Sequence, residues 1–293
     1  GLGIRQRLGA LPGITLKSID PERRKDPEAK RALLAEADLV VLCLPDAAAK
    51  ETVAMIDALG EKGPRIVDAS TAHRVAPGWV FGFPELAPEQ EDAIRKARRV
   101  ANPGCYPSGG IALLRPLVDA GLLPTDYPVT INAVSGYSGG GRSMIEAYEA
   151  GTAPDFELYA LGLEHKHVPE LQKYSGLTRR PIFVPSVGNF RQGMLVSVPL
   201  HLDTLPGRPK GADLQAALEK RYARSKLVRV VPIAEGDSGR LEPQALNETD
   251  RMELRVYANE KHRQAVLVAR LDNLGKGASG AAAQNVALML GLA

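Results

Sequence analysis

The stretch RRVANPGCYPSGGIALLRPLV (98–118) joins a short apolar segment, a Pro/Gly turn and a second apolar run. The first part is typical of a strand, Pro103-Gly104 interrupts it, and IALLRPL predicts a helix. A strand that turns directly into a helix is the repeating unit of an open α/β sheet, and ligands bind at such junctions. Cys105 stands at this junction, where the helix is expected to begin.

Strands and short helices also alternate upstream of this junction. Strands are expected at 14–19, 38–46, 65–70 and 98–104, and helices at 2–10, 27–37 and 47–59. This alternation predicts βαβ units and a parallel sheet. A dinucleotide-binding fold normally opens with a strand and a glycine-rich turn. Because Gly1 resembles the last glycine of that turn, we expect the first strand of the fold to be missing from this chain.

Downstream of residue 125 the segments become longer strands with few helices between them. Strands are expected at 129–138, 180–187, 193–202, 227–233, 251–258 and 264–272, and a last helix at 278–293. We therefore predict an α/β protein of two domains. Residues 1–104 and 276–293 form a Rossmann-type dinucleotide-binding domain. Residues 105–275 form an α+β domain with a large mixed, mostly antiparallel sheet.

The composition excludes several classes of protein. The 293 residues carry a net charge of only +3, and the basic side chains are scattered, so nucleic-acid binding is not indicated. The apolar runs are too short to span a bilayer, so no membrane partner is expected. The two cysteines do not form a CxxC motif and cannot build a disulfide framework. With no signal peptide at the start, a reducing cytoplasm is the expected location.

Cys105 is the strongest candidate for a nucleophile. The reactive form of a cysteine is the thiolate, and the N–H groups and dipole at the start of a helix favour an anion there. The other interpretation is a buried structural cysteine. We expect Cys43, inside the apolar run LVVLCLP, to be of that kind.

A nucleophilic cysteine needs a proton acceptor and a group that orients it. EHKHVPEL (164–171) offers His165 and His167, with Glu170 three residues after His167. A surface loop with solvated histidines is the alternative, and we accept it for the remaining histidines, His73, His201 and His262. A metal site built from the two histidines and the glutamate is also conceivable, but the spacing does not match HExxH, and we predict no metal.

Three glycine-containing stretches are candidate anion sites. SGYSGGGR (135–142) ends in Arg142, FRQGM (190–194) contains Arg191, and DNLGKGASG (272–280) precedes the last helix. Glycine lets backbone N–H groups approach a phosphate, and arginine adds a cation. A simple turn explains each stretch equally well on composition alone.

The choice of cofactor depends on SIDPERRKD (18–26), which follows the second predicted strand. An acid at such a position binds a free ribose hydroxyl, whereas arginine binds a 2′-phosphate. Ser18, Arg23, Arg24 and Lys25 favour NADP, and Asp20 is the evidence against it. A solvated run of charges is the alternative.

Four motifs in order resemble one enzyme family. They are ANPGCYPSG (101–109), SGYSGGGR (135–142), HKHVPE (165–170) and LDNLGKGASGAAAQN (271–285). Together they resemble the N-acetyl-gamma-glutamyl-phosphate reductases of arginine biosynthesis, and the resemblance runs along the whole chain. DASTAHR (68–74), GFPEL (82–86) and SIDPERRKD (18–26) are similar to the shorter form of that family.

The resemblance implies an NADPH-dependent reduction of an acyl phosphate to an aldehyde. Cys105 would expel phosphate and form a thioester, which hydride reduces. His167 would be the acid/base, oriented by Glu170, with His165 as the alternate or as a substrate contact. The implied substrate contacts are Ser108, Arg142 and Arg191. The implied cofactor contacts are Gly1, Ser18, Arg23, Arg24, Asn273, Lys276 and Gly277.

The resemblance also implies that the Rossmann-type domain binds NADP, that residues 105–275 are the catalytic and oligomerisation domain, and that a homo-oligomer forms through the large sheet. Other functions stay open at this point. The nearest is a reductase of the one-carbon-longer N-acetyl-aminoadipyl phosphate, since one methylene gives only ~1–3 kcal/mol of discrimination. A non-catalytic NADP-binding regulator and a metal-dependent hydrolase that uses the HKH cluster are the others.

Overall fold

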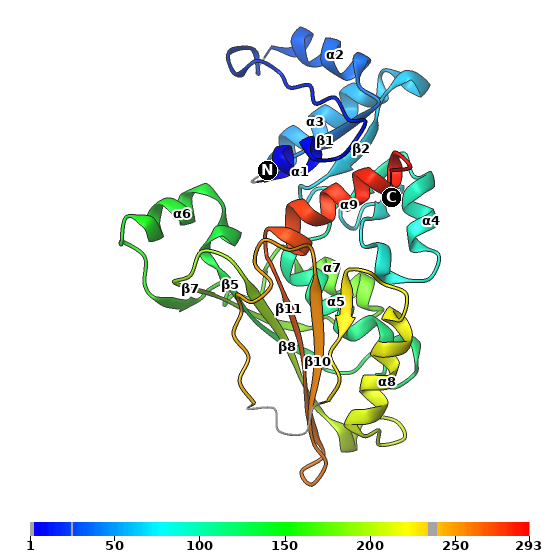
Figure 1. Cartoon of the computed structure of the whole chain (residues 1–293), viewed down its shortest axis with the longest axis vertical. Coiled ribbons are helices and arrows are strands. Elements are labelled where there is room, and N and C mark those ends of the chain that lie inside the picture. Colours follow the sequence, from blue (N-terminus) through cyan, green and yellow to red (C-terminus); the bar gives the residue numbers. More distant parts are fainter. Residues whose placement is uncertain (1–2, 25, 234–238, 293) are drawn as a thin grey trace. The chain divides into compact units, whose positions relative to one another are not determined.

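The computed structural model describes residues 3–24, 26–233 and 239–292. They form two compact units (Figure 1). Unit 1 comprises the residues up to Pro84, Glu89–Pro103 and the residues from Ser279 onward. Unit 2 comprises Glu85–Pro88 and Gly104–Ala278. The short segment Glu85–Pro88 therefore belongs to unit 2, although the residues on both sides of it belong to unit 1.

Unit 1 contains a parallel sheet, as predicted. Its strands are β1 (Leu39–Leu42), β2 (Arg65–Asp68), β3 (Val80–Phe81) and β4 (Arg99–Ala101), in the order β1-β2-β4-β3. The strand predicted at 14–19 was wrong, because these residues do not join the sheet in the described part of the chain. A strand exists only where a neighbouring strand pairs with its N–H and C=O groups, and hydrophobic composition alone does not supply that neighbour.

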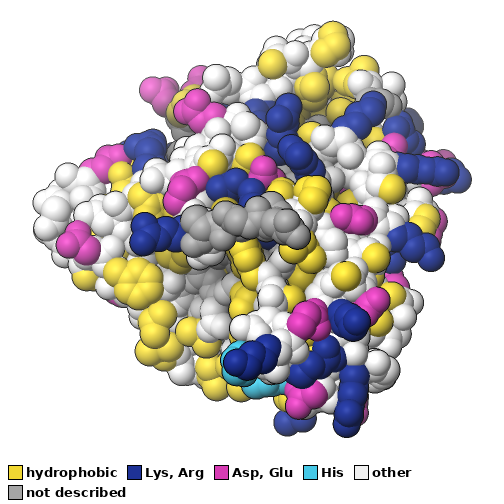
Figure 2. Space-filling model, turned by 60° about the horizontal axis from the view of Figure 1, so that its bottom comes forward, with side chains coloured by type: hydrophobic (Ala, Val, Ile, Leu, Met, Phe, Trp, Pro, Cys, Tyr) yellow, Lys and Arg dark blue, Asp and Glu magenta, His cyan; other side chains and the backbone are white. Residues whose placement is uncertain are grey.

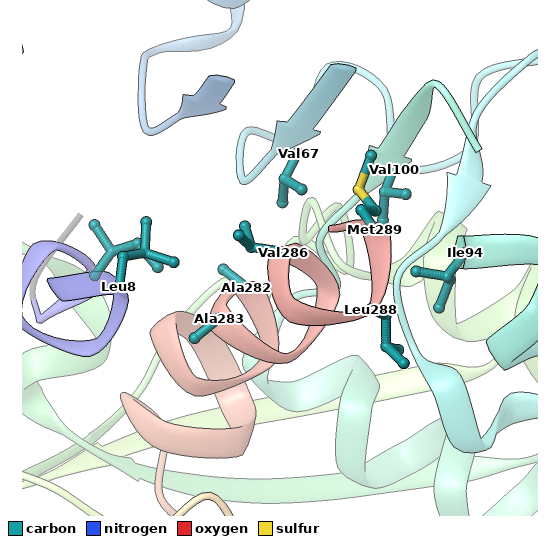
Figure 3. Packing of buried hydrophobic residues seen from close by; sticks show 10 residues of the cluster. Leu8, Val67, Ile94, Val100, Ala282, Ala283, Val286, Leu288 and Met289 are labelled. Carbon is teal, nitrogen blue, oxygen red and sulfur yellow. The ribbon is translucent and has the colours of Figure 1, made fainter. Parts of the chain in front are cut away.

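Helices cover both faces of this sheet. They are α1 (Ile4–Gly9), α2 (Pro27–Glu36), α3 (Asp46–Asp57), α4 (Gln90–Lys96) and α9 (Gly280–Met289). Successive side chains of a strand point to opposite faces, so Val67 packs with Val286 of α9 while Ile66 packs with Val53 of α3. Figure 3 shows α9 lying across β2 and β4, with α1 and α4 beside it.

Two side chains of unit 1 differ from the sequence prediction. Cys43 is exposed, because β1 ends at Leu42 and the cysteine lies in the loop beyond it. His73 is buried rather than solvated. Its Nδ1 lies 2.6 Å from Oδ2 of Asp68, and its ring stacks on Trp79 at a centroid distance of 4.3 Å. A carboxylate and an aromatic face together explain why an imidazole is stable there.

Among the described residues, unit 2 contains a mixed sheet of seven strands. They are β5 (Thr130–Gly136), β6 (Phe156–Leu158), β7 (Ile182–Gly188), β8 (Met194–His201), β9 (Val228–Val230), β10 (Met252–Asn259) and β11 (Gln264–Leu271). The order is β6-β7-β5-β8-β11-β10-β9. Only the pairs β5–β7 and β10–β9 are parallel, so the predicted mixed, mostly antiparallel sheet is confirmed.

In the described part of unit 2, the α-helices beside this sheet are α5 (Cys105–Asp119), α6 (Arg142–Glu149), α7 (Val168–Ser175) and α8 (Gly211–Tyr222). Helix α5 packs on β8 and β11, with α7 and α8 beside it. Two glycines permit this close approach. A Cβ on Gly109 would lie 2.9 Å from Cγ2 of Val196, and one on Gly110 would lie 2.6 Å from Cδ2 of Leu171. The fold thereby fixes α5, and with it Cys105, against the sheet.

The other face of this sheet is open among the described residues. Burial alternates along β8, so Met194 and Val196 are buried while Leu195 and Ser197 are only half-buried. A hollow of about 730 Å³ lies over this face. It is lined mainly by the strands, with Phe156, Leu158, Val266 and Val268 among its apolar side chains. Figure 2 shows that hydrophobic side chains reach the surface in patches between charged ones.

Candidate active site

Cys105 is the first residue of α5, and Gly104 is the N-cap residue. The extended backbone of Gly104 (φ −72°, ψ 156°) turns the chain from β4 into the helix. Cys105 is half-buried, so reagents can still reach it. The junction predicted from the sequence therefore places a cysteine at the start of a 15-residue helix. Such a position stabilises a thiolate through the helix dipole and the first N–H groups.

Ser108, a predicted substrate contact, lies in the first turn of the same helix. Its side chain is fully buried, and its hydroxyl donates to the carbonyl oxygen of Gly104 over 3.0 Å. That hydrogen bond tightens the helix start that carries Cys105. A direct contact between Ser108 and substrate stays a prediction.

Glu170 lies on α7 and is 1% exposed. Its Oε2 accepts a hydrogen bond from the backbone N–H of Gly104 over 3.0 Å. The sequence predicted Glu170 as the partner of His167. The structure adds a contact that local spacing does not reveal, since the carboxylate holds the residue that directly precedes Cys105.

His165 and His167 lie together at the start of α7, and His167 is its N-cap residue. Their ring centroids are 4.7 Å apart, and Nδ1 of His165 accepts a hydrogen bond from the backbone N–H of His167 over 3.1 Å. Both rings make edge contacts with Tyr106, at centroid distances of 6.0 and 5.8 Å. The fold thus brings both predicted bases against Tyr106, the residue that directly follows the predicted nucleophile.

Two tyrosines of this site were not predicted. Tyr159 donates its hydroxyl hydrogen to the Tyr106 hydroxyl over 3.1 Å, and Tyr106 donates to the carbonyl oxygen of Ser186 over 3.0 Å. Burial raises the pKa of Tyr159 to about 12, and the negative charge of the Cys105 thiolate contributes to the rise. Burial also raises the pKa of Tyr106 strongly, with smaller contributions from Tyr159 and Cys105. The only sequence signal was the position of Tyr106 next to Cys105.

The glycine-rich loop 135–142 is mostly committed to internal contacts. The N–H groups of Gly136, Tyr137 and Ser138 donate to the carbonyl oxygens of Gly193, Phe190 and Arg191. A Cβ on Gly136 would lie 2.6 Å from the backbone nitrogen of Gln192. Gly136 therefore lets the backbone of the loop lie directly beside the backbone of residues 190–193. The N–H groups of residues 136–138 are consequently not the predicted phosphate cradle.

The two predicted substrate arginines lie at opposite ends of α6. Arg142 begins the helix, is 92% exposed and pairs with Glu146 at 2.9 Å. Arg191 is 58% exposed and pairs at 2.9 Å with Glu149, the last residue of the helix. Both guanidinium groups are thus held in ion pairs with glutamates of α6. Their contact with substrate stays a prediction.

The segment 272–277 ends at Gly277, which lies directly against Cys105. A Cβ on Gly277 would lie only 2.9 Å from Cβ of Cys105. The amide of Asn273 is used inside the unit, where its oxygen accepts from the N–H of Gly193 at 2.8 Å and its nitrogen donates to the hydroxyl of Ser138 at 2.9 Å. Lys276 is 1% exposed and pairs with both carboxylate oxygens of Glu85 at 2.8 Å. Their predicted roles in cofactor binding are untested.

The predicted cofactor residues of unit 1 are exposed. Ser18 and Arg24 reach solvent, and Arg23 pairs with Asp26 at 2.7 Å. Oδ1 of Asp20 accepts from the N–H of Glu22 at 2.9 Å. A hydroxyl and an exposed guanidinium are suitable donors for a 2′-phosphate, so these residues fit NADP. Gly1 and Lys25, which the sequence analysis also assigned to the cofactor, lie outside the described residues.

Two further observations concern the described residues as a set. They contain no group of three or more His, Cys, Asp or Glu side chains placed to hold a metal ion. None of their helices combines the length and the apolar character needed to cross a bilayer.

Models of two protein domains match the chain. Residues 13–94 match the NAD-binding domain of semialdehyde dehydrogenases, and residues 105–273 match the semialdehyde dehydrogenase dimerisation domain. The second match begins at Cys105 and includes every predicted catalytic residue. The two matches agree with the parallel sheet of unit 1 and the mixed sheet of unit 2.

Known proteins resemble the chain over nearly its full length. An N-acetyl-gamma-glutamyl-phosphate reductase of Chelativorans sp. is 55% identical over 99% of this chain and 94% of its own length. N-acetyl-gamma-glutamyl-phosphate reductase 2 of Pseudomonas putida is 50% identical over 99% of this chain and 93% of its own length. The crystal structure of aspartate semialdehyde dehydrogenase II from Vibrio cholerae shares 17% identity and a TM-score of 0.65, over 88% of this chain and 81% of that one. The last similarity concerns the fold alone.

Proposed function

The chain belongs to the semialdehyde dehydrogenase family and, within it, to the N-acetyl-gamma-glutamyl-phosphate reductases, and we propose that Cys105 is the nucleophile of its reaction. The reaction is the NADPH-dependent conversion of N-acetyl-gamma-glutamyl phosphate to N-acetylglutamate semialdehyde and phosphate in arginine biosynthesis. One observation carries the role of Cys105. It begins helix α5, and the neighbouring Tyr106 contacts both histidines of the HKH motif.

Cys105 performs the first chemical step. Its sulfur forms a bond to the acyl carbon, the bond from that carbon to the phosphate oxygen breaks, and phosphate leaves with the electron pair. A thioester on Cys105 results. The start of α5 favours the thiolate that this attack needs, and Glu170 supports the geometry by holding the N–H of Gly104.

The oxygen of the acyl group gains negative charge when the thioester is reduced, and a proton must neutralise it. His167 is our choice for this acid, because an imidazole titrates near neutral pH and this one is buried beside Tyr106. His165 lies against His167 and accepts a hydrogen bond from its backbone N–H, so His165 is the alternate acid or a substrate contact. The carbon–sulfur bond then breaks, the hydroxyl proton returns to His167, the aldehyde leaves, and the thiolate of Cys105 is restored.

NADPH supplies a hydride when it is bound, which is the reductant that this conversion needs. Ser18 and Arg24 of unit 1 would hold its 2′-phosphate, since both are exposed and carry suitable donors. Arg23 would join them only by leaving its ion pair with Asp26. These contacts, with the cytoplasmic location expected from the two cysteines, remain proposals.

A homo-oligomer is indicated by the match to a dimerisation domain. We infer that the open face of the seven-stranded sheet is the surface that pairs. It offers apolar side chains on strands whose other face is already covered by α5, α7 and α8. Burial of such a face against a second copy is favourable by about 25 cal/mol per Å² of apolar surface.

The test is the reverse reaction with N-acetylglutamate semialdehyde, phosphate and NADP, followed by the absorbance of NADPH. We expect phosphate-dependent formation of NADPH that disappears in Cys105→Ser and persists in Cys43→Ser. The second variant is a matched control, because Cys43 is the other cysteine of the chain. Wild-type rates in Cys105→Ser would reject the thioester mechanism.

A further inference from the structure

Lys276 is a buried cation that the steps above do not use. Its side chain is 1% exposed, and its Nζ lies 2.8 Å from each carboxylate oxygen of Glu85. Glu85 belongs to the four-residue segment Glu85–Pro88 of unit 2, so the pair lies within that unit. Burial of an ion pair often stabilises a fold no better than apolar residues of similar volume. The presence of this pair therefore calls for an explanation other than stability.

Lys276 lies on an unusual turn. Residues Gly275–Ser279 form a π-helix, and the N–H of Gly277 donates to the carbonyl oxygen of Asp272 over 3.0 Å. Such turns are rare and occur frequently at functional sites. In this one the residue after Lys276 is Gly277, whose Cα faces Cys105.

Gly277 and Cys105 lie so close together that no side chain fits between them. A Cβ on Gly277 would lie 2.9 Å from Cβ and 3.3 Å from Cα of Cys105. The π-helical turn therefore limits the positions that the cysteine can adopt on that side. Movement of the turn by a fraction of an ångström changes the space around the thiol.

Residues 272 and 273, just before the π-helical turn, are held by other hydrogen bonds. Asp272 accepts hydrogen bonds from the side chain of Gln192 and the backbone N–H of Glu248, at 2.5 and 2.8 Å. Asn273 bonds Gly193 and Ser138. These contacts hold residues 272 and 273. The two carboxylate oxygens of Glu85 hold the side chain of Lys276, the residue that directly precedes Gly277.

We propose that Glu85 and Lys276 are a pair of positioning residues that fix the π-helical turn against Cys105 and thereby set the orientation of its thiol. This inference rests on the proposed role of Cys105. Two carboxylate oxygens on one ammonium resist displacement in more directions than a single hydrogen bond does. A misplacement of the nucleophile by about 1 Å lowers the rate about 100-fold without a matching change in substrate binding.

The experiment uses the full chain with Cys43→Ser, so that Cys105 is its only thiol. Three quantities are measured: kcat and KM in the reverse reaction, the rate of Cys105 alkylation by iodoacetamide between pH 6 and 9, and the melting temperature. Glu85→Gln removes one charge. Glu85→Met/Lys276→Met replaces both charges by apolar side chains, which protects folding if the single variant is unstable.

We expect both variants to lose about 10- to 100-fold in kcat with KM changed less than about threefold, and to show a shifted pH profile of alkylation. Glu253→Gln is the matched control, because Glu253 pairs with Arg270 at 2.6 Å in the same unit. It should lower the melting temperature while kcat and the alkylation profile keep their wild-type values.

Gly277→Ala tests the close contact between the π-helical turn and Cys105 directly. Its Cβ should displace Cys105 and depress kcat, whereas Gly162→Ala, where no atom lies within 4 Å, should be neutral. The proposal is overturned if the double variant folds with wild-type kcat and a wild-type alkylation profile. Activity that survives Cys105→Ser would instead reject the proposed function, and the alkylation profile would still report whether the pair positions the thiol.

Discussion

The carboxylate of Glu170 on α7 accepts a hydrogen bond of 3.0 Å from the backbone N–H of Gly104. The two residues are 66 positions apart in the sequence. Gly104 caps the helix that Cys105 begins, so the contact links the HKHVPE motif to the nucleophile. A helix leaves its first N–H groups without partners inside the helix, and a buried one needs an acceptor. Glu170 therefore contributes to the shape of the site as well as to its charge.

Glu170→Ala should destabilise the protein by about 1–3 kcal/mol, because the buried N–H of Gly104 loses its acceptor. Glu170→Gln keeps an oxygen in the same place and should retain more of the stability. Urea unfolding of the three proteins measures the difference. Equal losses in the two variants would mean that the carboxylate charge, and not the hydrogen bond to Gly104, determines the effect.

His167→Asn should lower kcat by about 10²- to 10⁴-fold, which is the usual contribution of a general acid. His73→Asn is the control, because both histidines are almost fully buried but His73 pairs with Asp68 in unit 1. It should affect stability more than chemistry. Steady-state rates of both variants, with His165→Asn beside them, assign the acid. If His165→Asn shows the larger loss in kcat, the roles of the two imidazoles are reversed.

Alkaline pH should weaken the fold through Tyr159. Burial raises its pKa to about 12, above the ordinary value of 10. Below pH 10 the folded and unfolded chains both hold the phenolic proton, and the contribution of this group is fully present. Between pH 10 and 12 only the folded chain holds it, so stability falls as pH rises, by up to about 1.4 kcal/mol per unit. Urea unfolding in this range should show a steeper decline for the wild type than for Tyr159→Phe.

Val266→Asp should prevent self-association. Val266 lines the open face of the sheet and is 38% exposed, so a charge there is tolerated in the single chain but not against a second copy. Sedimentation of the variant should give a smaller species than the wild type. Leu16→Asp, on an equally exposed leucine of unit 1, should sediment like the wild type. An unchanged size of Val266→Asp would place the interface elsewhere.

Local sequence was a reliable guide to the elements, because periodicity and turn residues act within a few residues. The start of α2 shows the reason, since Asp26 accepts the N–H groups of Glu28 and Ala29 and Pro27 follows it directly. Prediction failed where contacts with another part of the chain determine whether a segment pairs as a strand or a side chain is buried. Residues 14–19 have strand composition but no place in the sheet, and Cys43 follows an apolar strand yet is exposed.

The sequence by itself determined that Cys105 begins a helix, that two histidines and a glutamate share one short segment, and that the first part of the chain forms a parallel sheet. All of these follow from residues close together in the chain. Only the tertiary structure decided that Glu170 reaches Gly104, that Lys276 meets Glu85 across 191 residues, and that Arg142 and Arg191 stand at opposite ends of α6. Such pairings depend on the order of strands in a sheet and on which faces pack, and no local pattern encodes that order.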